Sequence, residues 1–398
     1  MSLKSLLKRI ILEQGSNCKS CQGQKPRLNE VDWDKFSDML PEDSCLSNEE
    51  VVAFLNRTKE RMSNKIPLTN PKHIKDVIIT GDIVNFVMDE DGNINVDAFA
   101  KMITQTPKQI IDRNPKAEKS DIGRPQLTVN TGIPALFAII FDKKTNKFHT
   151  ISTCPSAGTC LKGCFARKAH YLMNTGKVMK LTQRVNLLMN DPELYEELAY
   201  AELLKYAVQA KSEDKKFLIR WNDAGDFYTE TYLNIAKNIT KRFLDARFDT
   251  MSYAYTKRGK YVMELNDDDT FVINFSTDAK STDVKQIQDY GLEKVKFSHR
   301  IPKEVFAGIF APPEKGQLSK FKNGKAGEKE LKDIVYNYLM KDKRYDFSFV
   351  TRDSLRYTWE LPSNQSGKFR YNIIVLPNND SDIGAQRTDV QGSFLCEH

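Results

Sequence analysis

The sequence contains no apolar run long enough to cross a membrane. A membrane-spanning helix needs about 18 or more consecutive apolar residues, and polar residues interrupt every apolar stretch of the 398-residue chain before that length. Residues 2–14 mix leucine and isoleucine with lysine and arginine, which predicts a short amphipathic surface helix and not a secretory signal. We therefore expect neither a membrane span nor export.

Cysteine is sparse, and its distribution excludes a disulfide scaffold. The chain has seven cysteines, an odd number, and three of them fall within one short loop. This pattern favours a reducing compartment and metal chemistry. Cys18 and Cys21 form a second close pair, but with only Cys45 nearby they are a weak indication of zinc. Cys396 stands alone near the chain end.

Neither sign of charge dominates the chain. There are 60 lysines and arginines against 53 aspartates and glutamates, a net charge of +7. The surplus is spread along the sequence, so it is compatible with a nucleic-acid or nucleotide partner but also with an ordinary solvated surface.

The first 120 residues have few long apolar runs, which predicts a small α+β appendage at residues 1–120 and a larger core at residues 121–398. Within the appendage we expect a helix over residues 48–63, capped by Ser47 or Asn48. Residues 77–96 predict strands around an Asp-Gly turn. A linker is expected between Pro107 and Pro115.

The core alternates short apolar runs with helical patterns. A hairpin is expected over residues 136–152, followed by two helices. The further expected strands are 217–221, 250–255, 270–275, 294–298, 346–350 and 369–376, and the expected helices are 165–189, 192–210, 229–243, 260–265, 282–290 and 328–340. This alternation predicts an α/β fold with a mainly parallel sheet, either open and doubly wound or closed into a full or partial (β/α) barrel.

Three cysteines, Cys154, Cys160 and Cys164, follow the hairpin in a loop rich in proline, glycine and small polar residues. Such a loop can turn back and bring three thiolates together, which suits a soft metal or an iron–sulfur cluster. An unfilled fourth position would make the centre reactive. The alternative is three unrelated thiols in a buried loop.

Polar side chains follow each expected strand of the core, and the carboxyl ends of parallel strands form the active-site edge of α/β folds. Helix capping explains some of these side chains, but not Arg220, Trp221, Lys257 or His299. We therefore expect one composite site. The candidate catalytic residues are Arg220, Asp226 and His299. The candidate cofactor-binding residues are Asn222, Gly225, Asp226, Tyr255, Ser276 and Asp278.

The order of a cysteine loop, an acidic turn and polar strand ends resembles the radical S-adenosylmethionine enzymes. The stretches 154–166, 220–227 and 382–390 more narrowly resemble the phage gene product 88 domain family, over roughly residues 121 to 398. The resemblance implies a phage-encoded protein of the host-cell cytoplasm or the virion. It further implies a [4Fe-4S] cluster on Cys154, Cys160 and Cys164, with S-adenosylmethionine bound by its methionyl amine to Gly225 and Asp226.

Three functions remain open from the sequence. The first is a cluster-bearing enzyme acting on a nucleotide or nucleic acid. The second is a module that binds zinc through the three loop cysteines and His149 or His170, and grips nucleic acid or a protein. The third is an inert scaffold or virion-associated protein with an enzyme-like fold.

Overall fold

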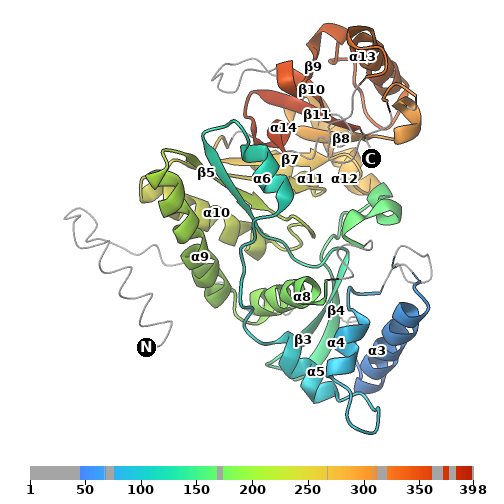
Figure 1. Ribbon diagram of the computed structural model, residues 1–398, viewed down its shortest axis with the longest axis vertical. Helices are drawn as coiled ribbons and strands as arrows, with labels where there is room; N and C mark the ends of the chain where they lie inside the picture. Colours follow the sequence, from blue (N-terminus) through green and yellow to red (C-terminus); the bar gives the residue numbers. More distant parts are fainter. Residues whose placement is uncertain are drawn as a thin grey trace, which may run out of the picture.

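Figure 1 shows the computed structural model, in which a lobe built around a large sheet stands above a smaller lobe of helices and a hairpin. The expected helix at residues 2–14, the pair Cys18 and Cys21, and His170 lie outside the described residues. The residues described are 45–66, 68, 76–167, 174–266, 268–306, 308–311, 321–360, 371–375 and 382–396.

The smaller lobe begins with the expected helix α3 (Asn48–Ser63), and Ser47 caps it in a reciprocal capping box with Glu50. The strand prediction that follows was wrong for residues 81–86, which form helix α4 (Gly81–Phe86), whereas Met88 and Ile94 do form an antiparallel bridge across the expected Asp-Gly turn. The hydroxyl of Thr80 accepts the N–H of Ile83 and so starts this helix. Helix α5 (Val96–Ile103) completes the group.

The expected linker between residues 107 and 115 was also wrong. Ile110 and Ile111 are fully buried, and the main chain of Asp112 pairs with that of Asn130. Helix α6 (Pro115–Asp121) follows immediately. Two adjacent buried isoleucines anchor this segment to the core.

The hairpin is confirmed as β3 (Phe137–Asp142) and β4 (Lys147–Ser152), and β1 (Cys45–Leu46) adds a third antiparallel strand. This sheet is separate from the large one, so the strand before the cysteine loop is not a strand of the parallel core. Phe148 stacks on Phe99 of α5 with ring centroids 5.9 Å apart. The hairpin thus packs with the helices that precede residue 120.

The large sheet is parallel throughout, as expected. Its eight strands lie in the order β2 (Gln126–Asn130), β5 (Lys216–Trp221), β6 (Thr250–Thr256), β7 (Phe271–Ser276), β8 (Phe297–Ile301), β11 (Val390–Cys396), β10 (Tyr371–Val375) and β9 (Leu355–Tyr357). Strands β2 and β9 are the two edges, and no pairing among the described residues joins them. The sheet is therefore open.

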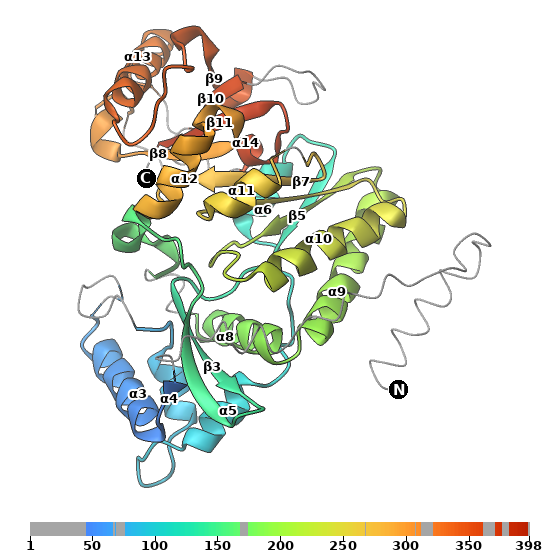
Figure 2. The same ribbon diagram turned by 180° about the vertical axis from the view of Figure 1, so that it is seen from behind.

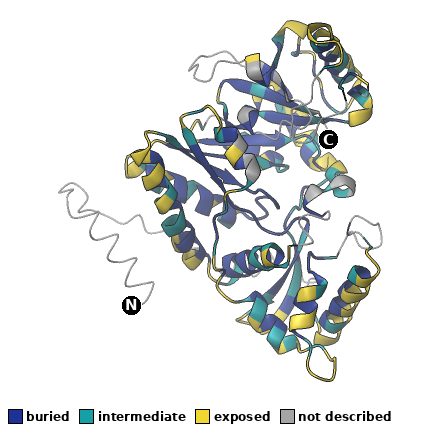
Figure 3. Cartoon of the chain, in the orientation of Figure 1, coloured by how far each residue is buried: buried dark blue, intermediate teal, exposed yellow. Residues whose placement is uncertain are grey.

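Helices cover both faces of the sheet, which is why its strands are buried on both sides. The short helices α6 and α14 lie before the sheet in Figure 1, whereas α10 and α11 lie before it in Figure 2. Figure 3 shows buried strands with exposed residues on the outer sides of the helices. The bounds of the α-helices not yet given are α8 (Thr175–Asn190), α9 (Pro192–Ser212), α10 (Glu230–Asp245), α11 (Gly259–Glu264), α12 (Ser281–Tyr290), α13 (Lys325–Lys341) and α14 (Ile383–Gln386).

Strand β5 shows how the two faces differ. Phe217, Ile219 and Trp221 join the main hydrophobic core on one face, while Leu218 and Arg220 alternate onto the other. The indole N–H of Trp221 donates to the Ser252 hydroxyl at 3.0 Å. Trp221 is therefore a packing residue.

Several expected elements differ from the structure in detail. The strand predicted at residues 346–350 is irregular chain, and β9 forms slightly later. Neither β2 nor β11 was expected as a strand. Helix α9 begins as predicted, with Asp191 as its cap, whereas α12 is preceded by Lys280 without a side-chain cap. No helix of the described residues is long and apolar enough to span a membrane.

Candidate functional site

The cysteine loop is bound through its main chain to the carboxyl end of β7. The N–H of Gly158 donates to the carbonyl of Asp278 at 3.0 Å, and Ala157 and Ala279 form an isolated bridge. A Cβ on Gly158 would lie 2.2 Å from the carbonyl oxygen of Ala279. Only glycine allows the two chain segments to approach so closely.

Side chains and a second strand end add to this attachment. The hydroxyl of Thr159 donates to the Asp278 carboxylate at 2.8 Å. The N–H of Asp226, after β5, donates to the carbonyl of Thr153 at 2.9 Å. The loop that carries the cysteines thus lies at the same sheet edge as Asp226 and Asp278.

Lys257, the residue after β6, lies among these loops. Burial by itself lowers the pKa of its ammonium, but Cys160, Asp226, Cys154 and Asp278 outweigh burial and raise the pKa above its usual range. Among the described residues the ammonium has neither a hydrogen-bond partner nor an ion pair. A partly buried cation surrounded by thiols and carboxylates, yet bonded to none of them, is a natural contact for an anionic ligand.

The thiols themselves are poorly ionised in this arrangement. Burial and a nearby carboxylate raise the pKa of Cys154 to about 12, although the main-chain N–H of Leu136 donates to its sulfur at 3.4 Å. Burial also raises the pKa of Cys160, and Lys257 opposes it. Cys164 contributes to the pKa of both other thiols. Thiolates here need a counter-charge beyond Lys257.

The donors near the cysteine loop do not suit every group that the sequence suggests. Zinc binds its ligands at about 2.0–2.3 Å, and no three His, Cys, Asp or Glu side chains of the described residues are placed to hold one ion. His149 lies within β4, roughly 17 Å from Cys154 along an extended strand. An iron–sulfur cluster spreads its thiolates over different iron atoms, so a cluster does not require three donors placed around one ion.

The carboxylate of Asp226 is engaged by hydrogen bonds within the protein. The residue is 1% exposed, and its carboxylate accepts hydrogen bonds from the N–H of Phe227 at 2.7 Å, the hydroxyl of Thr256 at 2.6 Å and the N–H of Lys257 at 3.0 Å. These bonds take three of about four acceptor positions. Asp226 therefore ties the ends of β5 and β6 together and positions Lys257.

The backbone conformation next to Asp226 requires a glycine at position 225. Its φ is +82°, and a Cβ would lie 2.4 Å from the side chain of Ile133. Both the left-handed conformation and the lack of space exclude other residues. Gly225 lets the β5 loop pack against the chain that leaves β2.

Arg220 is paired inside the protein and not free for a substrate. Its guanidinium lies 3.0 Å from Asp382 and 3.5 Å from Asp223. Burial alone would lower the pKa of Arg220, but the two carboxylates outweigh burial and raise it. Tyr253 and Tyr255 donate their hydroxyls to the same Asp382. This buried group fixes α14 to the sheet.

Asn222 is a strand-end amide without a hydrogen-bond partner among the described residues. It is 5% exposed, and neither its amide nitrogen nor its oxygen forms a hydrogen bond among the described residues. Its φ is +60°, a left-handed conformation that asparagine tolerates better than most residues. A buried unpaired amide at a strand end marks a place for a polar ligand group.

The other expected cofactor-binding residues are Asp278, Ser276 and Tyr255. Asp278 accepts from Thr159 and lies 3.2 Å from the Arg300 guanidinium. Ser276, the last residue of β7, is half-buried and aligned with Ser298 on β8. Tyr255 is engaged by Asp382, as described above. Of these, Ser276 keeps its hydroxyl available.

His299, a predicted catalytic residue, lies in the aromatic core. It is fully buried, its Nδ1 shares a 2.8 Å hydrogen bond with the Thr277 hydroxyl, and its ring contacts Phe347 and Phe394. Burial lowers its pKa to about 4. Because side chains alternate along a strand, His299 faces the helices while Arg300 faces the site.

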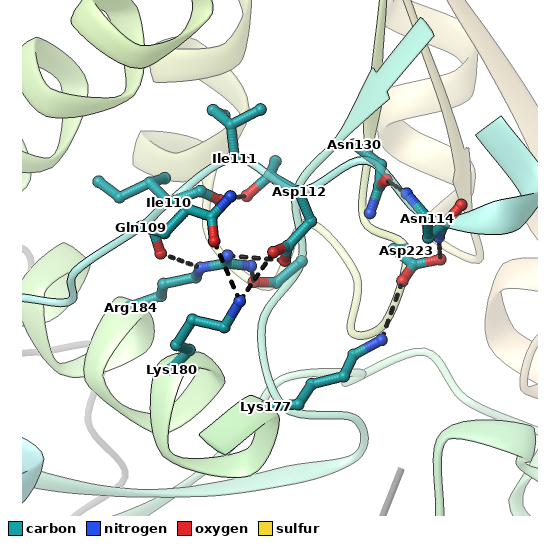
Figure 4. A network of polar contacts seen from close by, with 12 residues as sticks. Gln109, Ile110, Ile111, Asp112, Asn114, Asn130, Lys177, Lys180, Arg184 and Asp223 are labelled. Atoms are coloured by element: carbon teal, nitrogen blue, oxygen red, sulfur yellow. Dashed lines mark hydrogen bonds and ion pairs between the residues drawn. The ribbon is translucent and has the colours of Figure 1, made fainter. Parts of the chain in front are cut away.

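Figure 4 shows a second polar cluster beside the β5 loop. Asp112 binds Lys180 at 2.9 Å and Arg184 at 2.7 Å. Asp223 accepts from Asn114 at 2.9 Å and lies 3.7 Å from Lys177. A cavity of about 630 Å³ adjoins these residues, and two of the lysines that line it, Lys177 and Lys180, are paired with carboxylates.

Sequence reasoning missed three contributors to this edge. Lys257 was noted only as a residue that capping does not explain, Asp382 only as part of a tail motif, and Asp223 only as a neighbour of Asp226. The two carboxylates come from segments about 160 residues apart in the chain. A buried charge requires a partner, and that requirement is the one sequence feature that could have predicted them.

Comparison with known proteins gives one match. No curated protein and no solved structure matches the chain. The family model described as gene product 88 matches residues 103–304, a span that includes the cysteine loop, Asp226, Lys257 and Asp278. Since this span exceeds half of the chain, the protein belongs to the gene product 88 family.

Proposed function

We propose that this protein is an iron–sulfur enzyme of the radical S-adenosylmethionine type, with a [4Fe-4S] cluster bound by Cys154, Cys160 and Cys164. The observation that carries the proposal is the unpartnered Lys257 ammonium among thiols and carboxylates. A cluster held by three thiolates is anionic, and a neighbouring ammonium compensates that charge in a partly buried site.

The order of elements supports the same conclusion. The cysteine loop lies in the chain between β2 and β5, which are the first two strands of the parallel sheet and are neighbours in it. The acidic turn follows β5, and further polar groups follow β6 and β7. The radical S-adenosylmethionine enzymes, whose core is a partial barrel, place their cluster loop and cosubstrate site in this order.

The roles of the protein's own residues follow from their contacts. Lys257 stabilises thiolates, and Asp226 holds Lys257 in place through its main chain. Asn222 offers an unused amide to a polar group of the cosubstrate. When bound, the reduced cluster supplies one electron for the cleavage of S-adenosylmethionine. The surrounding buried edge excludes water from that reaction.

The zinc module and the inert scaffold are less well supported. Zinc needs a set of close donors that the described residues do not offer, and a scaffold has no use for an unpaired amide and ammonium at one edge. As substrate we propose a nucleotide or nucleic acid, and as location the cytoplasm of a phage-infected host or the virion.

The first test is the metal content of protein isolated without oxygen. We expect a brown protein with about four iron and four sulfide per chain, and we expect Cys160→Ser to lose most of both. Cys45→Ser, which changes an exposed cysteine outside the site, is the matched control and should keep the iron. A colourless protein, or one zinc per chain, refutes the cluster.

The second test concerns the cosubstrate. Reduced protein given S-adenosylmethionine should form 5′-deoxyadenosine. Asn222→Gly keeps the left-handed backbone and removes only the amide, so it should weaken S-adenosylmethionine binding about tenfold, the effect of a lost hydrogen bond to a charged group, with unchanged iron. Failure of the loaded wild-type protein to bind S-adenosylmethionine by calorimetry contradicts this assignment even if the cluster is present.

A further inference from the structure

The amino ends of β2 and β5 border a second, basic cavity. It has a volume of about 530 Å³, and it is far from the cysteine loop because it lies at the opposite edge of the parallel sheet. Lys216 and Arg220 stand on the same face of β5, roughly 13 Å apart along the strand. Five cationic side chains line the cavity against two carboxylates, Asp214 and Asp249.

Most of these cations are unpaired. Lys215 binds Glu213 at 2.7 Å, and Lys211 lies over the ring of Phe248. In contrast, Arg124, Lys216 and Arg247 have neither an ion pair nor a side-chain hydrogen bond among the described residues. The surplus of positive charge in this cavity is therefore available to a ligand.

The cavity beside the polar cluster of Figure 4 can be compared with this one for the pairing of its cations. It is also lined by cations, but Arg113 binds Asp121 at 3.1 Å, Lys177 lies 3.7 Å from Asp223 and Lys180 binds Asp112 at 2.9 Å. Three of the four cations that line that cavity are therefore paired, all but Lys108, whereas at the amino edge Lys215 is the one cation of five with an ion pair among the described residues. Unneutralised like charges repel one another unless an anion joins them.

Arg124 lies in the field of a second arginine, Arg387. It is half-buried, and burial together with the positive charge of Arg387 lowers its pKa, which Asp121 only partly offsets. Arg387 is itself committed to Asp389. A guanidinium that is half-buried beside a second arginine, and that lines an open cavity, is suited to an anion with several oxygens, such as a phosphate group.

We propose that the cavity formed by Arg124, Lys211, Lys215, Lys216 and Arg247 binds the phosphate of a nucleotide or of a nucleic-acid strand. The cavity is of the size that holds a nucleotide-sized ligand. Its cations come from the segment before β2, from the end of α9 and the start of β5, and from the turn after α10. The site does not depend on the proposed cluster, because the two lie at opposite strand ends.

The test measures binding of a fluorescently labelled single-stranded oligonucleotide by anisotropy at low salt. The variant Arg124→Gln/Lys216→Gln/Arg247→Asn removes three charges, and asparagine suits the left-handed φ of +58° at position 247. We expect at least a tenfold loss of affinity. The slope of log K against log salt should fall by about two, since each phosphate contact contributes about 0.7 on a single strand.

The matched control is Lys241→Gln/Lys260→Gln/Lys285→Gln, which removes three exposed lysines that pair with acidic residues elsewhere. It should stay within twofold of the wild type. Equal weakening of both variants would mean that only net charge matters, and it overturns the site, as does a wild type that binds no phosphate compound. The single variant Lys216→Gln, expected to lose about threefold, serves if the triple variant does not fold.

Competition distinguishes the two sources of phosphate. If a nucleoside triphosphate displaces the oligonucleotide from the wild type at low concentration, and the triple variant binds neither, the ligand is a free nucleotide. If only unlabelled oligonucleotide competes, it is a strand. Repeating the measurement on Cys160→Ser separates this site from the proposed function, because binding should persist without any cluster.

Discussion

The two edges of the parallel sheet use charge in opposite ways. At the carboxyl edge, charged side chains are buried and mostly committed, as in the contacts of Arg220 with Asp382 and Asp223. At the amino edge, Lys216 and Arg124 are partly exposed and unpaired. One strand thus carries a structural cation at one end and an available cation at the other.

The difference shows how burial decides what a charge can do. A buried ion must be paired, because its desolvation costs several kcal/mol, so most strand-end charges here serve the fold. Two polar residues at the carboxyl edge, Lys257 and Asn222, have no such partner among the described residues. They are therefore the residues that indicate a ligand. At the amino edge water already solvates the cations, and their availability costs little.

The largest expected effect comes from removing the buried cation. Arg220→Met leaves Asp382 and Asp223 buried without their partner, and we expect a loss of about 3–5 kcal/mol in the free energy of unfolding. Lys216→Met, on the same face of the same strand, should change it by less than about 0.5 kcal/mol. Urea unfolding measures both.

A second substitution sharpens this result. Asp382→Asn in the Arg220→Met background should restore part of the loss, since the remaining buried charge is then neutral. Equal losses from Arg220→Met and Lys216→Met would remove the distinction between the two edges.

The next effect is a dependence on pH. The pKa of His299 is lowered by burial from 6.5 to about 4. Between these values the unfolded chain takes up a proton that the folded protein does not. The contribution of His299 to the free energy of unfolding is therefore fully present above about pH 6.5 and is lost as the pH drops toward 4. The loss attributable to this residue is on the order of 3 kcal/mol.

Unfolding measured from pH 7 to pH 4 tests this expectation. His299→Gln has no proton to take up, so its stability should decline less steeply than that of the wild type over the same range. Parallel pH profiles would show that His299 is not held neutral by the core.

The smallest of these effects concerns the attachment of the cysteine loop. Gly158→Ala places a Cβ against the carbonyl of Ala279, and we expect a loss of about 1–3 kcal/mol from overpacking, with reduced iron content. Gly176→Ala is the control, because the nearest atom lies at 3.5 Å and alanine favours the helix by up to about 1 kcal/mol. Full iron content in Gly158→Ala would contradict the proposed positioning role.

Much of the local structure could be predicted because its causes are local. Ser47 caps helix α3 and helix α9 begins at Pro192, as expected, and the alternation of Phe217, Ile219 and Trp221 predicts a buried strand. The error at residues 77–86 has an identifiable source. Residues 77–86 are apolar and β-branched, but the Thr80 cap and packing against the neighbouring helices produce a helix.

The candidate site was predicted as a set of strand ends, and the cysteine loop, Asp226 and Asp278 do lie at one sheet edge. That they form one functional site stays a prediction. The role of each residue did not follow from its type. Asp226, expected to meet a cosubstrate, is used up by Thr256 and two main-chain N–H groups, and His299 faces the core. Such outcomes depend on which partners the fold supplies, and the sequence does not state them.

By itself the sequence determined the parallel α/β core, the cysteine loop and the presence of polar strand ends, because helix caps, alternation and spacing act over a few residues. Only the tertiary structure decided that Asp382 neutralises Arg220. It also decided that among the described residues neither Lys257 nor Lys216 has an ion pair. The physical reason is that pairing is a matter of proximity in space, and residues far apart in the chain meet only once the sheet has formed.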